Sequence, residues 1–208
     1  MLDRKNFYID GKWVSPKEPR NHKVIDPSNE EICAEISLGG KKDVDKAVSA
    51  AKKAFETWAF SKKEERLDLL EKLYVVYKKR WAEMAKLISL EMGAPMKFST
   101  EMQAATGASH IKSFKNILKD FKFEKDLGEE KNNQKLLYEP KGVCALITPW
   151  NWPINQVNLK VIPALASACT VVLKPSEIAP LSSMLLAEMI DEVKFPSGVF
   201  NLVNGDGE

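Results

Sequence analysis

Two short polar segments, each directly after an apolar run, carry the side chains best suited to hold a polar ligand. The segment ITPWNWPINQ, residues 147–156, follows the apolar run GVCAL and contains Trp150 and Asn151. The segment KPSE follows the apolar run CTVVL and supplies Lys174 and Glu177. An amide, an ammonium and a carboxylate can together donate hydrogen bonds to a ligand and accept them from it. Whether these side chains form one site depends on the elements that position them.

The three cysteines are the other candidates for chemistry, either as nucleophiles or as metal ligands. Cys33, Cys144 and Cys169 are widely separated and follow no metal-ligand spacing, so no metal site is expected. Cys144 and Cys169 fall in predicted strands, where we expect buried, neutral thiols, and Cys33 belongs to a predicted hairpin far from the polar segments. None of the three is therefore expected to be catalytic.

Three apolar segments rich in β-branched residues predict the strands that position the polar segments. GVCALITP, CTVVLKP and GVFNLVNG are separated by stretches long enough for crossover helices, so residues 142–208 predict a β-α-β-α-β unit with parallel strands. Open parallel sheets bind ligands at the carboxyl ends of their strands. Pro149 and Pro153 keep the chain extended at one such end, so we expect both polar segments to face one crevice.

Residues 1–122 are predicted to form two hairpins followed by helices. Turn residues at Asp10 and Gly11, and again around Pro27–Asn29, each lie between two strand-like arms. Apolar residues at steps of three and four then predict a helix over Asp43–Trp58.

Two further helices and an exposed strand element complete the expected organisation. Ser61 and Glu64 have the spacing of a capping box and open a long amphipathic helix that runs to Met92. A third helix is predicted over Phe98–Leu118. Residues 123–141 contain a polar stretch, typical of a loop or an exposed strand pair, and then the strand-like KLLYEP.

Charge and hydropathy exclude several classes of partner. The chain has 31 Lys and Arg against 29 Asp and Glu, and the charges are interspersed, so neither nucleic acid nor an anionic membrane is an expected partner. No segment has the apolar length of a signal peptide or a membrane span, and the unpaired cysteines suit a reducing compartment. We therefore expect a cytoplasmic protein.

The ordered series ITPWNWP, VVLKPSE and GVFNLVNGDG resembles the aldehyde dehydrogenase superfamily. The resemblance extends back through YIDGKWV, VIDPSNEE, VDKAVSAAKKAFETW, ERLDLLEKL and ISLEMGAP, and so covers essentially the whole chain. It implies an α/β fold in which a partial Rossmann-like sheet with flanking helices binds NAD(P). It also implies that the opening hairpins and the KLLYEP region contribute to an oligomerisation element. The implied function is the N-terminal part of an enzyme that oxidises an aldehyde to a carboxylic acid through a cysteine thioester.

The resemblance assigns a role to each polar segment. Asn151 matches the family asparagine whose amide donates to the oxyanion, a contact commonly worth about 2.7–4 kcal/mol. Lys174 and Glu177 match the pair that holds the adenosine ribose hydroxyls, which favours NAD over NADP because Glu177 would repel a 2′-phosphate. The remaining matched cofactor neighbours are Ile147, Thr148, Pro149, Trp150 and Gly207.

Each of these residues also has a purely structural interpretation. Asn151 is typical of a helix N-cap, the Lys174 and Glu177 pair is typical of an exposed turn, and Trp150 is typical of a packing residue. The joint occurrence of these residues at the ends of consecutive predicted strands favours the functional interpretation.

The chain lacks the GQxC setting of the family nucleophile and the ELGGK-like setting of the family base. We therefore expect an N-terminal fragment without the catalytic domain, inactive alone, that pairs with a separately encoded C-terminal half or forms a homo-oligomer. The alternative is a non-catalytic remnant that serves as an interaction or oligomerisation module. Ala168 and Lys194 stand where the family commonly has glycine, so a left-handed backbone at either position would add roughly 1 kcal/mol of strain.

Overall fold

A computed structural model describes residues 1–127 and 134–207 and contains the predicted parallel sheet. Strands β8 (Val143–Ile147), β9 (Thr170–Lys174) and β10 (Phe200–Leu202) are parallel, with Cys144 opposite Val171 and Val171 opposite Phe200. The β-α-β-α-β expectation is therefore confirmed. Residues 128–133 of the predicted 123–141 element, and Glu208 at the end of the predicted 142–208 unit, lie outside the described residues.

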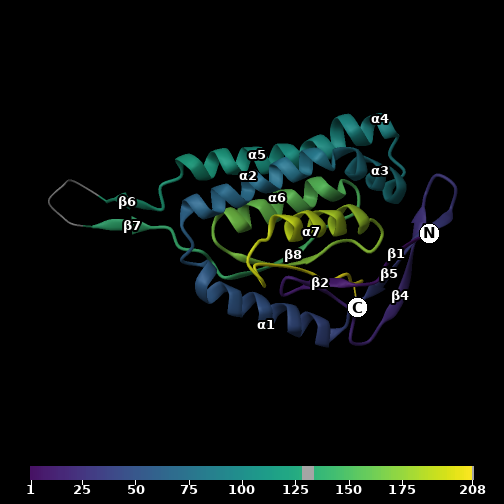
Figure 1. Cartoon of the computed structure of the whole chain (residues 1–208), viewed down its shortest axis with the longest axis horizontal. Helices are drawn as coiled ribbons and strands as arrows, with labels where there is room; N and C mark the ends of the chain where they lie inside the picture. Colours follow the sequence, from purple (N-terminus) through teal and green to yellow (C-terminus); the bar gives the residue numbers. More distant parts are fainter. Residues whose placement is uncertain (128–133, 208) are drawn as a thin grey trace.

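Helices cover the sheet on both faces (Figure 1). The crossover helices α6 (Pro153–Ala166) and α7 (Leu181–Val193) lie on one face, because a strand order that advances in one direction puts right-handed crossovers on the same side. Helix α1 (Lys41–Trp58) lies on the other face, and begins at Lys41 rather than at the predicted Asp43. Its Ala47 and Ala51 are buried together with Val172 and Val203 of the sheet.

The first predicted hairpin extends this sheet. Strands β2 (Phe7–Ile9) and β3 (Lys12–Val14) flank the Asp10 and Gly11 turn, and Tyr8 pairs with Leu202 of β10 in antiparallel register. The five strands therefore lie in the order β3-β2-β10-β9-β8, with β8 at one end.

A separate three-stranded sheet contains the second hairpin. Strands β4 (Arg20–Asp26) and β5 (Glu31–Leu38) form the hairpin, and β1 (Leu2–Arg4) pairs with β5 in parallel register. The glycine pair after β5 leads directly into α1, so this small sheet lies beside the carboxyl end of β10.

The long helix predicted from Ser61 to Met92 is divided in two. Helix α2 (Lys63–Lys79) and helix α3 (Trp81–Met92) are separated by Arg80, whose backbone at φ −98° and ψ 17° is not helical. The capping-box prediction is wrong, since the N-cap is Lys62 and no side chain caps this helix. Ser61 instead accepts hydrogen bonds from Arg66.

The predicted third helix contains a local change of winding. The short α4 (Met96–Phe98) runs through a π-helical turn at Ser99–Gln103 into α5 (Ala104–Asp120). Helices α2 and α5 form a layer outside α6 and α7 (Figure 1).

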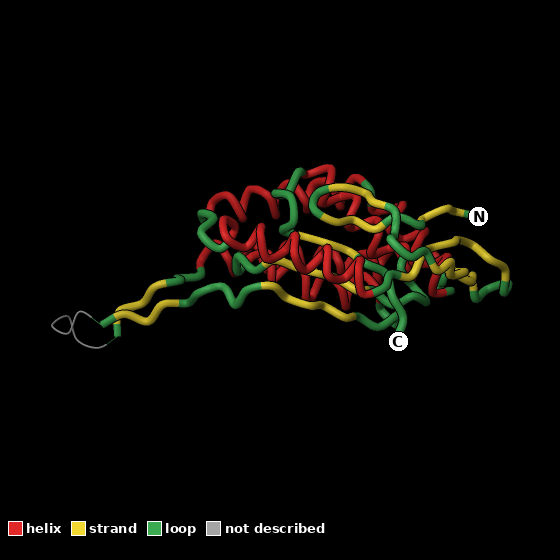
Figure 2. The backbone as a smooth tube through the Cα atoms, turned by 90° about the horizontal axis from the view of Figure 1, so that it is seen from below, coloured by secondary structure: helices red, strands yellow, loops and turns green. Residues whose placement is uncertain are grey.

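The polar stretch after α5 forms an exposed strand pair, one of the two predicted outcomes. Strands β6 (Glu124–Asp126) and β7 (Lys135–Leu137) are antiparallel and project from the body of the molecule (Figure 2). Across the described ranges, no helix combines the length and the apolar character that a membrane crossing requires.

Candidate functional site

A cavity of about 620 Å³ lies on the α1 side of the sheet, at the carboxyl ends of the parallel strands. Its floor is apolar and comprises Ala145, Ile147 and Val172 of the sheet, Val203 directly after β10 and Val44 of α1. Its rim is polar and includes Arg20, Lys41, Lys174, Asn204 and Asp206. An apolar floor with a few polar groups at the rim is the usual construction of a small-molecule site.

Of the predicted pair from the KPSE segment, Lys174 lines this cavity, and Glu177 lies outside the lining but contacts Lys174. Lys174 Nζ lies 3.3 Å from Glu177 Oε2, and both side chains are about a quarter exposed. The ammonium also donates to the carbonyl oxygen of Gly205 at 2.6 Å. Lys174 thus connects the end of β9 to the loop after β10, and leaves the Glu177 carboxylate accessible to a ligand.

The ITPWNWP segment is only partly at the cavity. Ile147 lines it, and Thr148 is fixed beside Lys174 because its backbone N–H donates to the Lys174 carbonyl at 3.2 Å. Thr148 Oγ1 is buried and has no hydrogen-bond partner among the described residues. Thr148 itself is not part of the cavity lining that the structure describes.

The remaining residues of the two predicted segments lie outside the cavity. Pro149, Trp150 and Asn151 are exposed on the loop before α6, and among the described residues they are not part of the cavity lining. The capping interpretation of Asn151 is wrong, since the N-cap of α6 is Trp152, which packs edge-on against Phe98.

Gly207 is the last described residue and is exposed. A Cβ placed on it would meet no atom within 4 Å, so nothing described in the structure requires glycine there.

Sequence reasoning missed the contribution of the small sheet to this cavity. Arg20 of β4 reaches across to Asp206, with two guanidinium nitrogens each 3.2 Å from a carboxylate oxygen. The backbone N–H of Gly39 donates to the carbonyl of Asn204 at 2.8 Å. These are tertiary contacts between distant parts of the chain, and no local spacing signals them.

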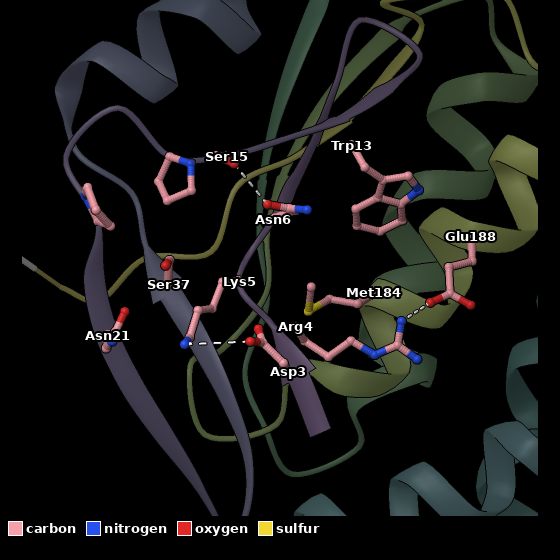
Figure 3. A pocket seen from close by; sticks show the side chains of 12 residues that line it. Asp3, Arg4, Lys5, Asn6, Trp13, Ser15, Asn21, Ser37, Met184 and Glu188 are labelled. Atoms are coloured by element: carbon pink, nitrogen blue, oxygen red, sulfur yellow. Dashed lines mark hydrogen bonds and ion pairs between the residues drawn. The ribbon is translucent and has the colours of Figure 1, made fainter. Parts of the chain in front are cut away.

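A larger hollow of about 750 Å³ lies elsewhere, between the N-terminal strands and α7 (Figure 3). Its charged groups are already paired, because Arg4 contacts Glu188 and Lys5 lies 3.6 Å from Asp3. None of its lining residues belongs to either polar segment, so the cavity at the carboxyl ends is the stronger candidate.

The cysteines lie away from this cavity. Cys169 is buried as predicted, whereas the predicted burial of Cys144 is wrong, because β8 is at the end of the sheet and leaves that residue only partly buried. Burial and the neighbouring Cys169 raise the pKa of Cys144 to about 11, which keeps the thiol protonated at neutral pH. No group of three His, Cys, Asp or Glu side chains is arranged to hold a metal in the part of the chain that the structure describes.

A buried carboxylate on α3 has a structural role. Glu91 is 1% exposed and accepts hydrogen bonds from the backbone N–H groups of Leu181 and Ser182 at the start of α7. Burial raises its pKa to about 7 in spite of those hydrogen bonds. The carboxylate therefore serves as a cap supplied by another helix.

Comparison with known proteins agrees with this architecture. The profile of the aldehyde dehydrogenase family matches residues 13–208. The 3-succinoylsemialdehyde-pyridine dehydrogenase of a Pseudomonas species is 51% identical over all of this chain, which covers 43% of that relative. The chain thus spans less than half the length of the curated relatives that it matches.

Solved structures give the same picture. An aldehyde dehydrogenase of Bartonella henselae is 57% identical with a TM-score of 0.96, over 100% of this chain and 44% of that one. Aldehyde dehydrogenase C of Pseudomonas syringae, solved with NAD+ and octanal, is 43% identical with a TM-score of 0.94, over 98% of this chain and 41% of that one. The sequence, the parallel sheet and these matches together place the chain in the aldehyde dehydrogenase family.

Proposed function

We propose that this chain forms the cofactor-binding part of an NAD-dependent aldehyde dehydrogenase. The observation that carries the proposal is the Lys174 and Glu177 pair at the carboxyl end of β9, beside a cavity with an apolar floor. A carboxylate next to an ammonium can accept from the two ribose hydroxyls while the ammonium donates to them. The relative from Pseudomonas syringae, solved with NAD+, supports the choice of a nicotinamide cofactor.

The residues around the cavity fit a dinucleotide. A volume of about 620 Å³ is within the range of ligand sites, and Asn204, which lines the cavity, has a side-chain oxygen without a hydrogen-bond partner among the described residues. NAD is favoured over NADP because a 2′-phosphate would approach the Glu177 carboxylate. When bound, the nicotinamide accepts the hydride from the substrate.

Asn151 is the proposed catalytic residue of this chain. Its exposed amide, at the carboxyl end of β8, would donate to the oxyanion that forms when a thiolate attacks an aldehyde. The nucleophilic cysteine and the base would have to come from outside this chain, since Cys33, Cys144 and Cys169 all lie away from the cavity. The chain alone is therefore proposed to be inactive.

Calorimetric titration of the purified chain with NAD tests the proposal. Lys174→Ala and Glu177→Ala should each abolish detectable binding, whereas Lys52→Ala, an exposed change on α1, should leave it unaltered. Glu177→Gln should narrow the preference for NAD over NADP, because it removes the charge that opposes the 2′-phosphate. Equal NAD affinity in the wild type and in both alanine variants would contradict the proposed site.

A second candidate function is an interaction or oligomerisation module. The projecting β6 and β7 hairpin within residues 123–141 favours it, because its described residues are exposed and lie away from the body of the molecule (Figure 2). Mixing the chain with a C-terminal aldehyde dehydrogenase polypeptide and following NADH absorbance over a panel of aldehydes separates the two candidates. Absence of NADH formation across the panel would favour the non-catalytic module.

A further inference from the structure

The loop that follows β10, Asn204–Gly207, is attached to the body by contacts from several parts of the fold, among them a 3.6 Å contact of Asn204 Nδ2 with Met184 Sδ of α7. The Gly39 N–H donates to the Asn204 carbonyl at 2.8 Å, and Lys174 Nζ donates to the Gly205 carbonyl at 2.6 Å. A further contact is the ion pair of Arg20 with Asp206. Two of the four loop residues are glycines, which have little conformational preference of their own, so external contacts must fix the loop.

The contact of Arg20 with Asp206 links the loop to the small sheet, and it is made by the side chain of Arg20. Its two terminal nitrogens each lie 3.2 Å from an Asp206 carboxylate oxygen, and one of them is 3.4 Å from the Gly39 carbonyl. This paired geometry fixes direction as well as distance, which a single ammonium contact does not. The guanidinium therefore joins β4, the entry to α1 and the loop after β10 at one corner of the cavity.

We propose that Arg20 is a positioning residue for nucleotide binding, which acts by holding the Asn204–Gly207 loop against the cavity through Asp206. The inference rests on the proposed function, because it concerns the same nucleotide site. Arg20 acts on the ligand indirectly, through Lys174. The Lys174 ammonium donates both to the Gly205 carbonyl of the loop and to the Glu177 carboxylate. A displaced loop would release one of the two partners that orient Lys174.

The effect should be on binding and not on folding. The side chains of Arg20 and Asp206 are 47% and 28% exposed, and an ion pair of that exposure contributes little to global stability. Fixing a glycine-containing loop before the ligand arrives instead lowers the entropy cost of binding. Loss of the ion pair should weaken nucleotide binding by roughly twofold to fivefold, which is the change in affinity that corresponds to the free energy of an exposed ion pair.

The experiment compares Arg20→Ala, Asp206→Ala, Arg20→Lys and the charge exchange Arg20→Asp with Asp206→Arg in the full chain. Calorimetry measures the affinity of each variant for NAD and for adenosine. Adenosine is included because it has no phosphate. A positioning role predicts equal weakening for both ligands in the alanine variants, partial retention in Arg20→Lys and recovery in the charge exchange. Melting temperatures should stay within about 2 °C of the wild type.

Amide hydrogen exchange at Gly39, whose N–H donates to the Asn204 carbonyl, gives a readout of loop attachment that needs no ligand. Faster exchange in Arg20→Ala, together with weaker binding of both ligands, supports the inference. Unchanged exchange at Gly39 overturns it, as does faster exchange with unaltered affinity. If NAD binding alone were weakened and the charge exchange did not restore it, Arg20 would contact a phosphate of NAD directly, and the positioning role would be wrong. Absence of NAD binding by a folded wild-type chain would contradict the proposed function itself, a result distinct from any of these.

Discussion

At the scale of single residues, backbone strain at Lys194 follows directly from the fold. Lys194 ends α7 with φ 63° and ψ 51°, and Ala168 likewise has φ 63° before β9. The sequence predicted strain at these two positions if the backbone were left-handed, and that condition is met. Only glycine adopts this conformation without a steric cost from Cβ.

Replacing Lys194 by glycine should stabilise the protein by about 1 kcal/mol, because the left-handed cap no longer carries a side chain. Its exposed contact with Asp191 contributes little, so losing that ion pair should not offset the gain. Urea unfolding measures the change. Lys46→Gly, at an exposed site inside α1, is the control and should destabilise by about 1 kcal/mol. Equal losses in the two variants would refute the strain argument.

Glu91 predicts a specific dependence of stability on pH. Burial raises the pKa of its carboxyl from 4.5 to about 7, so the folded protein keeps a proton that the unfolded chain releases in that window. Folding then takes up a proton, and the contribution of this group to stability falls as pH rises from about 4.5 to about 7 and is constant above. The loss should be on the order of 1–3 kcal/mol.

Glu91→Gln tests this dependence because it keeps the shape and cannot titrate. In urea unfolding between pH 5 and pH 8, the free energy of unfolding of the wild type should fall relative to that of the variant as pH rises. Glu65→Gln, an exposed change on α2, should show no such shift. A difference that stays constant across the pH range for Glu91→Gln would rule out the raised pKa.

At the scale of elements, one buried amide joins the first hairpin to the parallel sheet. Asn201 Oδ1 accepts from the Asp10 N–H at 3.0 Å, and its Nδ2 donates to the carbonyls of Val171 at 3.1 Å and Gly198 at 2.8 Å. The Asn201 side chain is fully buried, and its bonds to the Val171 and Gly198 carbonyls are buried as well, whereas Asp10 is exposed.

Asn201→Ala should therefore destabilise the protein by about 2–4 kcal/mol, since three hydrogen bonds are lost and the two buried carbonyls lose the amide that donates to them. Chemical denaturation measures this loss. The control is Asn21→Ala in β4, whose exposed side chain should contribute less than about 0.5 kcal/mol. A loss below 1 kcal/mol for Asn201→Ala would mean that water replaces the amide.

At the scale of the whole molecule, β8 ends the described sheet with its apolar residues partly exposed. Ile147 is 68% exposed, and Ala145 beside it is also accessible. A strand at the end of a sheet presents backbone groups that can pair with another chain.

The wild-type chain should therefore associate at high concentration, and Ala145→Lys should reduce that association by placing a charge on the strand. Sedimentation velocity over a concentration series measures the change. Val75→Lys, an equally polar change at an exposed site of α2, should leave association unaltered. Wild-type chains that stay monomeric throughout the series would exclude pairing along β8.

Local patterns in the sequence determined the strands β8, β9 and β10, the crossovers between them and the position of Lys174 and Glu177 at a strand end. Strand composition, turn residues and the one-way handedness of crossovers are local or general constraints, so they need no knowledge of distant contacts. Tertiary structure alone decided the break at Arg80, where Arg80 contacts Glu83 and Glu188, and the pairing of Tyr8 with β10. It also decided the meeting of Arg20 with Asp206 and of Glu91 with α7, because each joins residues far apart in the chain whose spacing carries no signal.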